Sequence, residues 1–318
     1  NSPDVGGRHS LLREFTNWTI TGSTTIVERG LGRQSLVFAP GATASQTFDP
    51  CTGFAVYFAQ GPAATPFSVY VDNVLVGSVI PDTTGADNRH DGVWTSGPLT
   101  RGAHAIKLVA GAGSIELSDV YGFNGDEAQG VQLWCAARGG AQLASFIGAV
   151  GAETRRRVTA LNPSLFSLMI SSNNYNAQTP IVTYKAQLET LIDEMTGAVT
   201  GPTSWILMAS PKRFDTVTTT IPYESYLNAI KEVADAPANA VYVDMVEGFP
   251  WTSASDDPYD LLAPDGIHAT NNGHAYQADR LAAGLNLPSR APVKKAVGAV
   301  TPPAPVAPIL VAGISGAG

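Results

Sequence analysis

The first half of the chain alternates apolar and polar residues in short runs separated by turn residues, a pattern typical of β-strands with one buried face. Asp72-Asn73 stands between two such runs and predicts a two-residue β-hairpin turn. Because each sheet needs a second layer to cover its apolar face, residues 18–124 are predicted to form a β-sandwich or jelly-roll domain. The predicted strands are residues 19–25, 34–38, 53–59, 67–71, 74–79, 104–109 and 114–120.

The pattern changes after residue 125, where continuous apolar runs alternate with segments of helical periodicity. This alternation predicts an α/β fold at residues 125–289, a parallel sheet with helices on both faces. Thr179-Pro180 opens one helix, whose predicted buried face consists of Tyr184, Leu188, Leu191, Ile192 and Met195. The predicted strands are 131–135, 165–170, 205–208 and 241–244, and the other predicted helices are 141–161, 223–233 and 274–285.

Residues 290–318 are rich in Pro, Ala and Val and predict an extended tail. An extended segment is ordered only if something holds it, so we expect a partner chain or a homo-oligomer to hold this tail. The chain starts on the loop-like Asn1-Ser2-Pro3-Asp4 and stops in Gly316-Ala317-Gly318. Both ends are expected to be cuts within a longer protein or the ends of a processed form.

Composition narrows the class of protein. The 318 residues are 44% hydrophobic and 14% charged, enough for two globular domains. The net charge of −8 comes without a basic cluster, which argues against a nucleic-acid partner. No apolar run reaches the roughly 20 residues of a transmembrane helix. Cys51 and Cys135 are either two buried thiols or one disulfide bridge. The five His show no metal-ligand spacing, so no metal or other cofactor is expected.

Three loops carry candidate chemistry. In Asp265-Gly-Ile-His268, the carboxylate can accept the Nδ1–H of the imidazole, which leaves Nε2 to take a proton from a nucleophile. Gly140 and Asn173 follow predicted strands, and catalytic groups gather at the carboxyl ends of parallel strands. A glycine N–H and an asparagine amide can both donate to an oxyanion. Taken singly, the segment from Asp265 to His268 is better explained as an ordinary surface loop. The Gly140 loop is equally well explained as a turn, and the Asn173 loop as a loop cap.

Taken together and in this order, Gly140, Asn173, Asp265 and His268 resemble the SGNH (GDSL-type) hydrolases over about residues 125–287. Residues 171–176 resemble the family's Gly-x-Asn-Asp block, and residues 265–268 resemble its Asp-x-x-His block. The resemblance implies that His268 is the general base, that Asp265 orients it, and that Asn173 and the Gly140 N–H form the oxyanion hole.

The resemblance is incomplete in the second block, where Ser171 replaces the usual Gly and Asn174 the usual Asp. The β segment resembles an insertion found in some SGNH proteins of phage tails. Residues 1–17 would then be a lead-in segment of the hydrolase domain.

The nucleophile is unknown at this point. The family's Gly-Asp-Ser block precedes the others, and it is absent here, as is any Gly-x-Ser-x-Gly elbow. Ser315 in Gly313-Ile-Ser-Gly-Ala317 lies in the tail and lacks the last Gly of that elbow. Three explanations stay open: a nucleophile upstream of Asn1, a decayed hydrolase kept as a binding or structural module, or a wrong fold assignment. Under the first two, the 318-residue chain is expected to be inactive.

The resemblance implies ester hydrolysis by a Ser–His–Asp mechanism on acyl or acetyl esters of a cell-surface glycan or lipid. It places the protein outside the cell or on a virion. The alternative is a catalytically silent structural or glycan-binding component of a virion tail or a secreted assembly.

Overall fold

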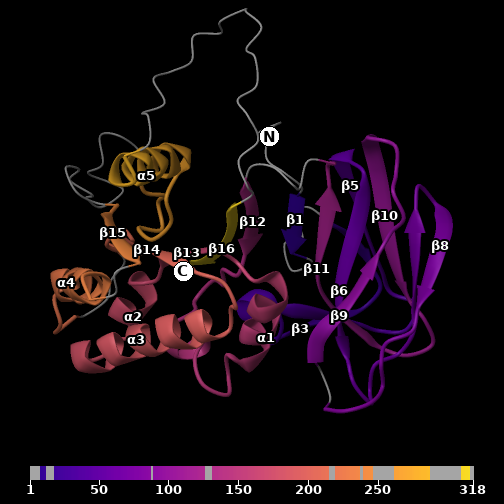
Figure 1. Cartoon of the computed structure of the whole chain (residues 1–318), viewed down its shortest axis with the longest axis horizontal. Coiled ribbons are helices and arrows are strands. Elements are labelled where there is room, and N and C mark those ends of the chain that lie inside the picture. Colours follow the sequence, from indigo (N-terminus) through magenta and orange to yellow (C-terminus); the bar gives the residue numbers. More distant parts are fainter. Residues whose placement is uncertain are drawn as a thin grey trace, which may run out of the picture.

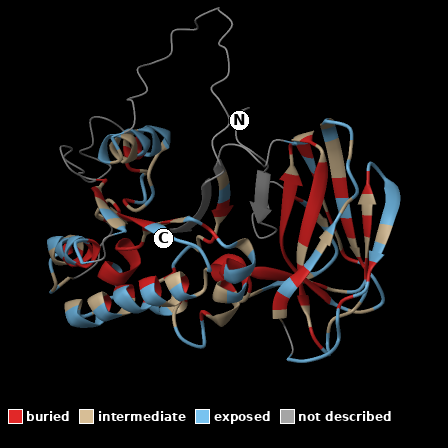
Figure 2. Cartoon of the chain, viewed as in Figure 1, coloured by how far each residue is buried: buried red, intermediate tan, exposed pale blue. Residues whose placement is uncertain are grey.

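The structure is a computed structural model that describes residues 8–11, 18–86, 89–125, 131–214, 219–236, 239–245, 261–286 and 309–315, with the backbone alone for 8–11, 131 and 309–315. A β-sandwich and an α/β region lie side by side (Figure 1). Buried residues follow the strands of both regions and the sheet-facing sides of the helices (Figure 2). This arrangement confirms the predicted fold class.

The sandwich consists of two antiparallel sheets that enclose an aromatic core. One sheet has the order β3-β4-β11-β6-β9, and the other has the order β2-β5-β10-β7-β8. The first sheet comprises β3 (Thr24–Val27), β4 (Ser35–Phe38), β11 (Ile115–Phe123), β6 (Gly53–Gln60) and β9 (Arg89–Thr95). The second comprises β2 (Thr19–Thr21), β5 (Thr43–Cys51), β10 (Gly102–Ala110), β7 (Phe67–Val71) and β8 (Val74–Val79).

The predicted hairpin at Asp72-Asn73 is confirmed. The two residues have φ of 51° and 66°, and they join β7 to β8. Positive φ at both central positions is what a type I′ turn requires. Asp72 also accepts a hydrogen bond from the Ala105 N–H at 2.9 Å, which ties the turn to β10.

The N-terminal segment is a correction to the sequence analysis. We expected residues 1–17 to lead into the hydrolase domain. Instead, β1 (Arg8–Leu11) pairs antiparallel with β11 and extends a sheet of the sandwich. The remainder of residues 1–17 lies outside the described residues.

The α/β region contains a parallel sheet of five strands in the order β12-β16-β13-β14-β15. Alternate residues of β14 face opposite layers: Trp205 and Leu207 belong to the core shared with α3 and α4, and Ile206 packs with Leu281 of α5. The strands are β12 (Val131–Cys135), β13 (Leu165–Met169), β14 (Ser204–Ala209), β15 (Ala240–Asp244) and β16 (Ile309–Ser315). The helices are α1 (Ala152–Leu161), α2 (Ser172–Asn176), α3 (Ile181–Gly197), α4 (Tyr223–Ala234) and α5 (Asn271–Gly284).

The predicted helix at residues 141–161 forms only in its second half. A short 3-10 helix, η2 (Leu143–Ser145), precedes α1. Gly148 between them has a φ of +60°, and a Cβ on Gly151 would lie 1.9 Å from the Phe146 carbonyl oxygen. The chain therefore turns sharply at these glycines, which interrupts the helix.

The C-terminal segment is the second correction. Residues 309–315, expected to be part of an extended tail, form β16 in the interior of the parallel sheet (Figure 1). Gly313 pairs with Cys135 of β12 on one side, and Ser315 pairs with Met169 of β13 on the other. Strands of the same chain thus hold β16 on both edges. That a partner chain or a second copy holds the rest of the tail stays a prediction. The rest of the predicted tail lies outside the described residues.

The core of the α/β region extends into the sandwich, where it includes Leu31, Ala55 and Tyr121. Tyr121 of the sandwich stacks on Trp134 of β12 with ring centres 4.7 Å apart. No disulfide joins Cys51, which is buried, to Cys135, which is half-buried. Within the described residues, no helix has the length and apolarity to span a bilayer.

Candidate active site

Asp265 and His268 lie on one tight loop before α5. The Ala263 N–H donates to the His268 carbonyl oxygen at 2.8 Å, and the Thr270 N–H donates to the Leu261 carbonyl oxygen at 2.9 Å. The side chain of Asp265 fills the loop: its Oδ1 accepts from the His268 N–H at 3.0 Å, and its Oδ2 lies 2.5 Å from His268 Nδ1. The predicted hydrogen bond between the two side chains is confirmed. It fixes Nδ1 as the bonded nitrogen and leaves Nε2 for proton transfer.

These hydrogen bonds shift the titration of the carboxylate. The bonds from the His268 side chain and backbone, with that from the Ile267 N–H, lower the pKa of Asp265 from 3.8 to about 2. Asp265 is therefore ionised at neutral pH and can stabilise an imidazolium ion at His268. The two side chains are 46% and 48% exposed, so solvent or a substrate reaches them directly.

The loop is anchored at its end by the start of α5. Thr270 is the N-cap, and its Oγ1 accepts from the Gly273 N–H at 3.2 Å. Gly273 packs against the loop so closely that a Cβ would lie 2.1 Å from the Leu261 carbonyl oxygen. Only glycine permits this approach, and it fixes the distance between helix and loop.

The same loop touches the carboxyl edge of the parallel sheet. Phe214 follows β14, and its N–H donates to the Gly266 carbonyl oxygen at 2.7 Å. Phe214 also packs beside Leu261 and Leu262. The pair Asp265–His268 is therefore attached at the edge where parallel α/β sheets bind ligands.

The two predicted oxyanion loops are joined to each other. Asn173 lies in α2 after β13, and its Nδ2 donates to the Ala141 carbonyl oxygen at 3.0 Å. Ala141 follows Gly140, which is exposed and has a φ of +71°. Asn174 reinforces the junction by accepting from the Leu143 N–H at 3.2 Å. The sequence analysis placed Gly140 and Asn173 on loops that follow two strands, and the structure shows a direct contact between those loops. That both groups face one cleft with His268 stays a prediction.

A buried hydroxyl cluster lies behind these loops, and the sequence did not reveal it. Ser171 Oγ lies 2.5 Å from Ser210 Oγ and 2.8 Å from the Tyr223 hydroxyl. Burial raises the pKa of Tyr223 to about 12, so the phenol stays protonated and donates. The cluster joins the ends of β13 and β14 to the start of α4. No local signal could have shown it, because Tyr223 is 52 residues from Ser171.

The cluster gives the departure at Ser171 a structural role. Where the resembled family has Gly, this chain has a fully buried hydroxyl that also accepts from the Ser210 N–H at 3.3 Å. Ser171 therefore links the ends of β13 and β14. Because its side chain is fully buried, it is not accessible to a substrate.

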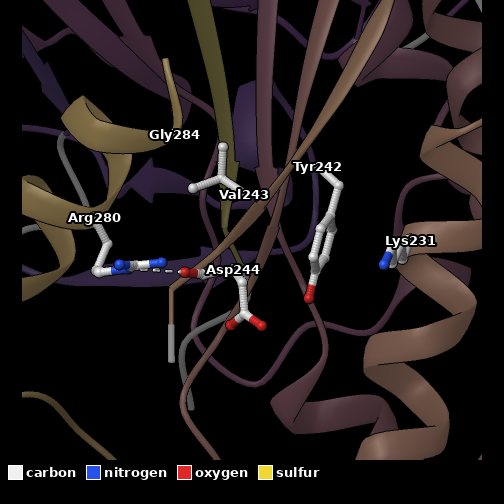
Figure 3. Close-up of a pocket in the computed structure, with 6 residues that line it drawn as sticks. All are labelled: Lys231, Tyr242, Val243, Asp244, Arg280 and Gly284. Carbon is white, nitrogen blue, oxygen red and sulfur yellow. Dashed lines mark hydrogen bonds between the residues drawn. The ribbon is translucent and has the colours of Figure 1, made fainter. Parts of the chain in front are cut away.

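A separate hollow of about 300 Å³ lies between α4, β15 and α5 (Figure 3). It is lined by Lys231, Tyr242, Val243, Asp244, Arg280 and Gly284. Arg280 Nε donates to the Asp244 carbonyl oxygen at 3.3 Å. The hollow contains none of the predicted catalytic residues, so it is distinct from the loop of Asp265 and His268.

Across the described part of the chain, no three His, Cys, Asp or Glu side chains gather as a metal site.

Residues 99–276, more than half of the chain, match the model of the GDSL-like lipase/acylhydrolase family. The chain resembles a solved peptidoglycan O-acetylesterase, with a TM-score of 0.60 and 13% identity over 89% of this chain and 77% of that chain. No curated protein matches the chain.

Two carbohydrate esterases resemble it more loosely. One is a family 2 enzyme with a carbohydrate-binding domain from Corynascus thermopiles (Myceliophthora fergusii), with a TM-score of 0.39 and 15% identity over 83% of this chain and 100% of that chain. The other is a family two esterase from Clostridium thermocellum, with a TM-score of 0.36 and 12% identity over 82% of this chain and 98% of that chain.

Proposed function

Because the chain belongs to the GDSL-like lipase/acylhydrolase family, we propose that it hydrolyses carboxylic esters with His268 as the general base and Asp265 as the carboxylate that orients it. The observation that carries this proposal is the 2.5 Å contact between Asp265 Oδ2 and His268 Nδ1 on a loop attached to the carboxyl edge of the sheet.

In this mechanism Nε2 of His268 takes the proton of the attacking hydroxyl and later returns it to the leaving alcohol. The lowered pKa of Asp265 keeps the neighbouring charge negative while the imidazole carries that proton. The N–H of Gly140 and the amide of Asn173 supply the oxyanion hole. The hydrogen bond from Asn173 to Ala141 supports this assignment because it holds the two loops in one arrangement before substrate binds.

We assign the substrate to acyl or acetyl esters of a cell-surface glycan or lipid, which places the protein outside the cell. The exposed side chains of Asp265 and His268 suit an ester carried on a large polymer, since no deep pocket has to admit the alcohol part. The likeness to a peptidoglycan O-acetylesterase supports the same substrate class. We also propose that the β-sandwich contacts the glycan.

The test is turnover of p-nitrophenyl acetate and release of acetate from O-acetylated peptidoglycan and acetylated xylan. His268→Ala should lower kcat by a factor on the order of 10³ or more, because loss of the base leaves only binding and oxyanion stabilisation. His274→Ala is the matched control: it removes an exposed histidine on α5, six residues further on. Equal turnover in the two variants would remove His268 from the mechanism. A folded wild-type protein that binds these glycans without releasing acetate would favour the silent glycan-binding alternative.

A further inference from the structure

The parallel sheet takes one of its interior strands from the last described segment of the chain. β16 comes after every other strand in the sequence, yet it lies between β12 and β13. If β16 is counted first, the sheet order reads 2-1-3-4-5, a common order of doubly wound α/β folds. The C-terminal segment therefore occupies the position that the first strand has in that order, which is a circularly permuted connectivity.

That position is the one where such sheets do their chemistry. In a 2-1-3-4-5 sheet, ligands bind outside the carboxyl ends of the first and third strands, which here are β16 and β13. Ser315 is the last residue of β16, and its backbone pairs with Met169, the last residue of β13. Neighbouring strands lie about 4.8 Å apart, so the backbone of Ser315 ends beside the loop that carries Asn173.

Both predicted oxyanion loops flank this strand end. The loop with Gly140 leaves β12 on one side of β16, and the loop with Asn173 leaves β13 on the other side. The 3.0 Å hydrogen bond from Asn173 to the Ala141 carbonyl oxygen joins these loops, and so it spans the carboxyl end of the strand between them. The loop of His268 is attached to the end of β14, on the Asn173 side.

Three serines at the ends of β13 and β14 are poor nucleophiles because they are buried. Ser171 is completely buried and bonded to Ser210 and Tyr223, and Ser172 and Ser210 are 6% and 8% exposed. Ser315 ends the strand that lies between β12 and β13, and Gly316 follows it in the sequence.

We propose that Ser315 is the nucleophile of this hydrolase, supplied to the centre of the active site by the C-terminal strand. The inference rests on the proposed ester hydrolysis and completes it. It reverses the expectation that the 318-residue chain lacks a nucleophile and is inactive.

The reaction then balances within this chain and water. Ser315 Oγ attacks the ester carbonyl carbon, its proton passes to His268 Nε2, and the carbonyl π electrons move to the oxygen held by the oxyanion donors. When the carbonyl re-forms, the bond to the alcohol oxygen breaks and the alcohol leaves with the proton from His268. Water then attacks the acyl-serine, again giving a proton to His268, and the return of that proton to Ser315 Oγ releases the carboxylic acid.

The experiment combines a fluorophosphonate probe with p-nitrophenyl acetate turnover, both on the full chain. The tryptic peptide after Lys295 carries Ser315 as its only serine, so mass spectrometry assigns the label without ambiguity. Wild type should take up one label on that peptide. Ser315→Ala should lose the label and lower kcat by a factor on the order of 10³ or more. Ser204→Ala, an exposed serine at the opposite end of the sheet on β14, should match wild type.

The outcomes separate this inference from the proposed function. If Ser315→Ala keeps wild-type turnover and the label moves to another serine while His268→Ala is inactive, the assignment of Ser315 fails and the proposed function stands. If wild type takes no label and has no turnover, the assignment of Ser315 and the proposed function both fail.

Hydrogen exchange tests the placement of β16 independently. The backbone amides of residues 309–315 should be as protected as those of β13, and rapid exchange there would overturn the placement of β16. If Ser315→Ala does not fold, Ser315→Cys should fold and react with iodoacetamide at that position, and a folded but unreactive cysteine would again overturn the assignment.

Discussion

Arg157 of α1 and Asp119 of β11 form an ion pair across the boundary between the α/β region and the sandwich. Their Nη2 and Oδ1 atoms lie 3.3 Å apart, and the side chains are only 2% and 0% exposed. The guanidinium of Arg157 also stands 3.7 Å from the centre of the Tyr57 ring. Arg157 of the α/β region thus contacts both the Asp119 carboxylate and the Tyr57 ring of the sandwich.

This pair predicts a large effect on stability. Arg157→Ala should lower the free energy of unfolding by about 3–5 kcal/mol, because it leaves the Asp119 carboxylate buried without its cation. Arg156→Ala, on the same helix but 42% exposed, should cost less than about 1 kcal/mol. Urea unfolding followed by tryptophan fluorescence measures both. Similar losses in the two variants would mean that the ion pair does not hold the regions together.

Asp265→Asn should damage catalysis while leaving the fold intact. An amide donates where the carboxylate accepts, so it favours the tautomer of His268 that places the proton on Nε2. By analogy with serine hydrolase triads, we expect kcat to fall by a factor on the order of 10³–10⁴. Steady-state turnover of p-nitrophenyl acetate measures the loss. A variant with unchanged kcat would show that Asp265 does not orient the base.

The same carboxylate predicts a pH dependence of stability. The pKa of Asp265 is lower in the folded protein than its ordinary value of 3.8, so its ionised form stabilises the fold. That contribution is fully present above pH 3.8 and is lost as the pH falls towards 2. The difference in melting temperature between wild type and Asp265→Asn should therefore be constant above about pH 5 and shrink below pH 4. A difference that grows on acidification would contradict the assigned hydrogen bonds.

Asn173→Ala tests the oxyanion hole. As one donor of two, its loss should lower kcat about a hundredfold with little change in KM. Because the side chain also donates to Ala141, a stability loss of about 1 kcal/mol should accompany it. Asn176→Ala, at the exposed end of the same short helix, controls for changes in α2. A loss confined to KM would indicate substrate binding in place of oxyanion stabilisation.

Gly273→Ala should move the loop of the predicted catalytic pair. The new Cβ would lie 2.1 Å from the Leu261 carbonyl oxygen, so the loop or the start of α5 must shift. We expect a lower melting temperature together with a loss of turnover. Gly197→Ala, where a Cβ meets no atom within 4 Å, should leave both unchanged. Full activity in Gly273→Ala would show that catalysis tolerates displacement of this loop.

The sequence predicted the elements that depend on residues close to one another in the chain. The buried face of α3, with Tyr184, Leu188 and Met195, follows from helical spacing alone, and the turn at Asp72 follows from residues that tolerate positive φ. The contact of Asp265 with His268 could be predicted equally well, because the two residues are three positions apart on one loop. In each case the decisive interaction lies within a few residues of chain.

What could not be predicted depends on pairing between distant segments. Ile309–Ser315 follows a proline-rich stretch and carries no turn or periodicity that predicts an interior strand, and its partners lie more than 140 residues earlier. The hydroxyl cluster of Ser171, Ser210 and Tyr223 likewise forms only when two strands and a helix meet. The break before α1 depends on Gly151 approaching the Phe146 carbonyl oxygen, a contact that helical periodicity does not report.

The position of β16 also bears on the biosynthesis of the protein. The interior strand β16 is the last of the five to leave the ribosome, so β12 and β13 each keep an unpaired edge while the sandwich, encoded earlier, folds. Exposed strand edges are sites of aggregation during synthesis. Nascent chains stalled before residue 309 should therefore hold a folded sandwich beside an unfinished sheet, and a peptide spanning residues 309–315 added in trans should complete it.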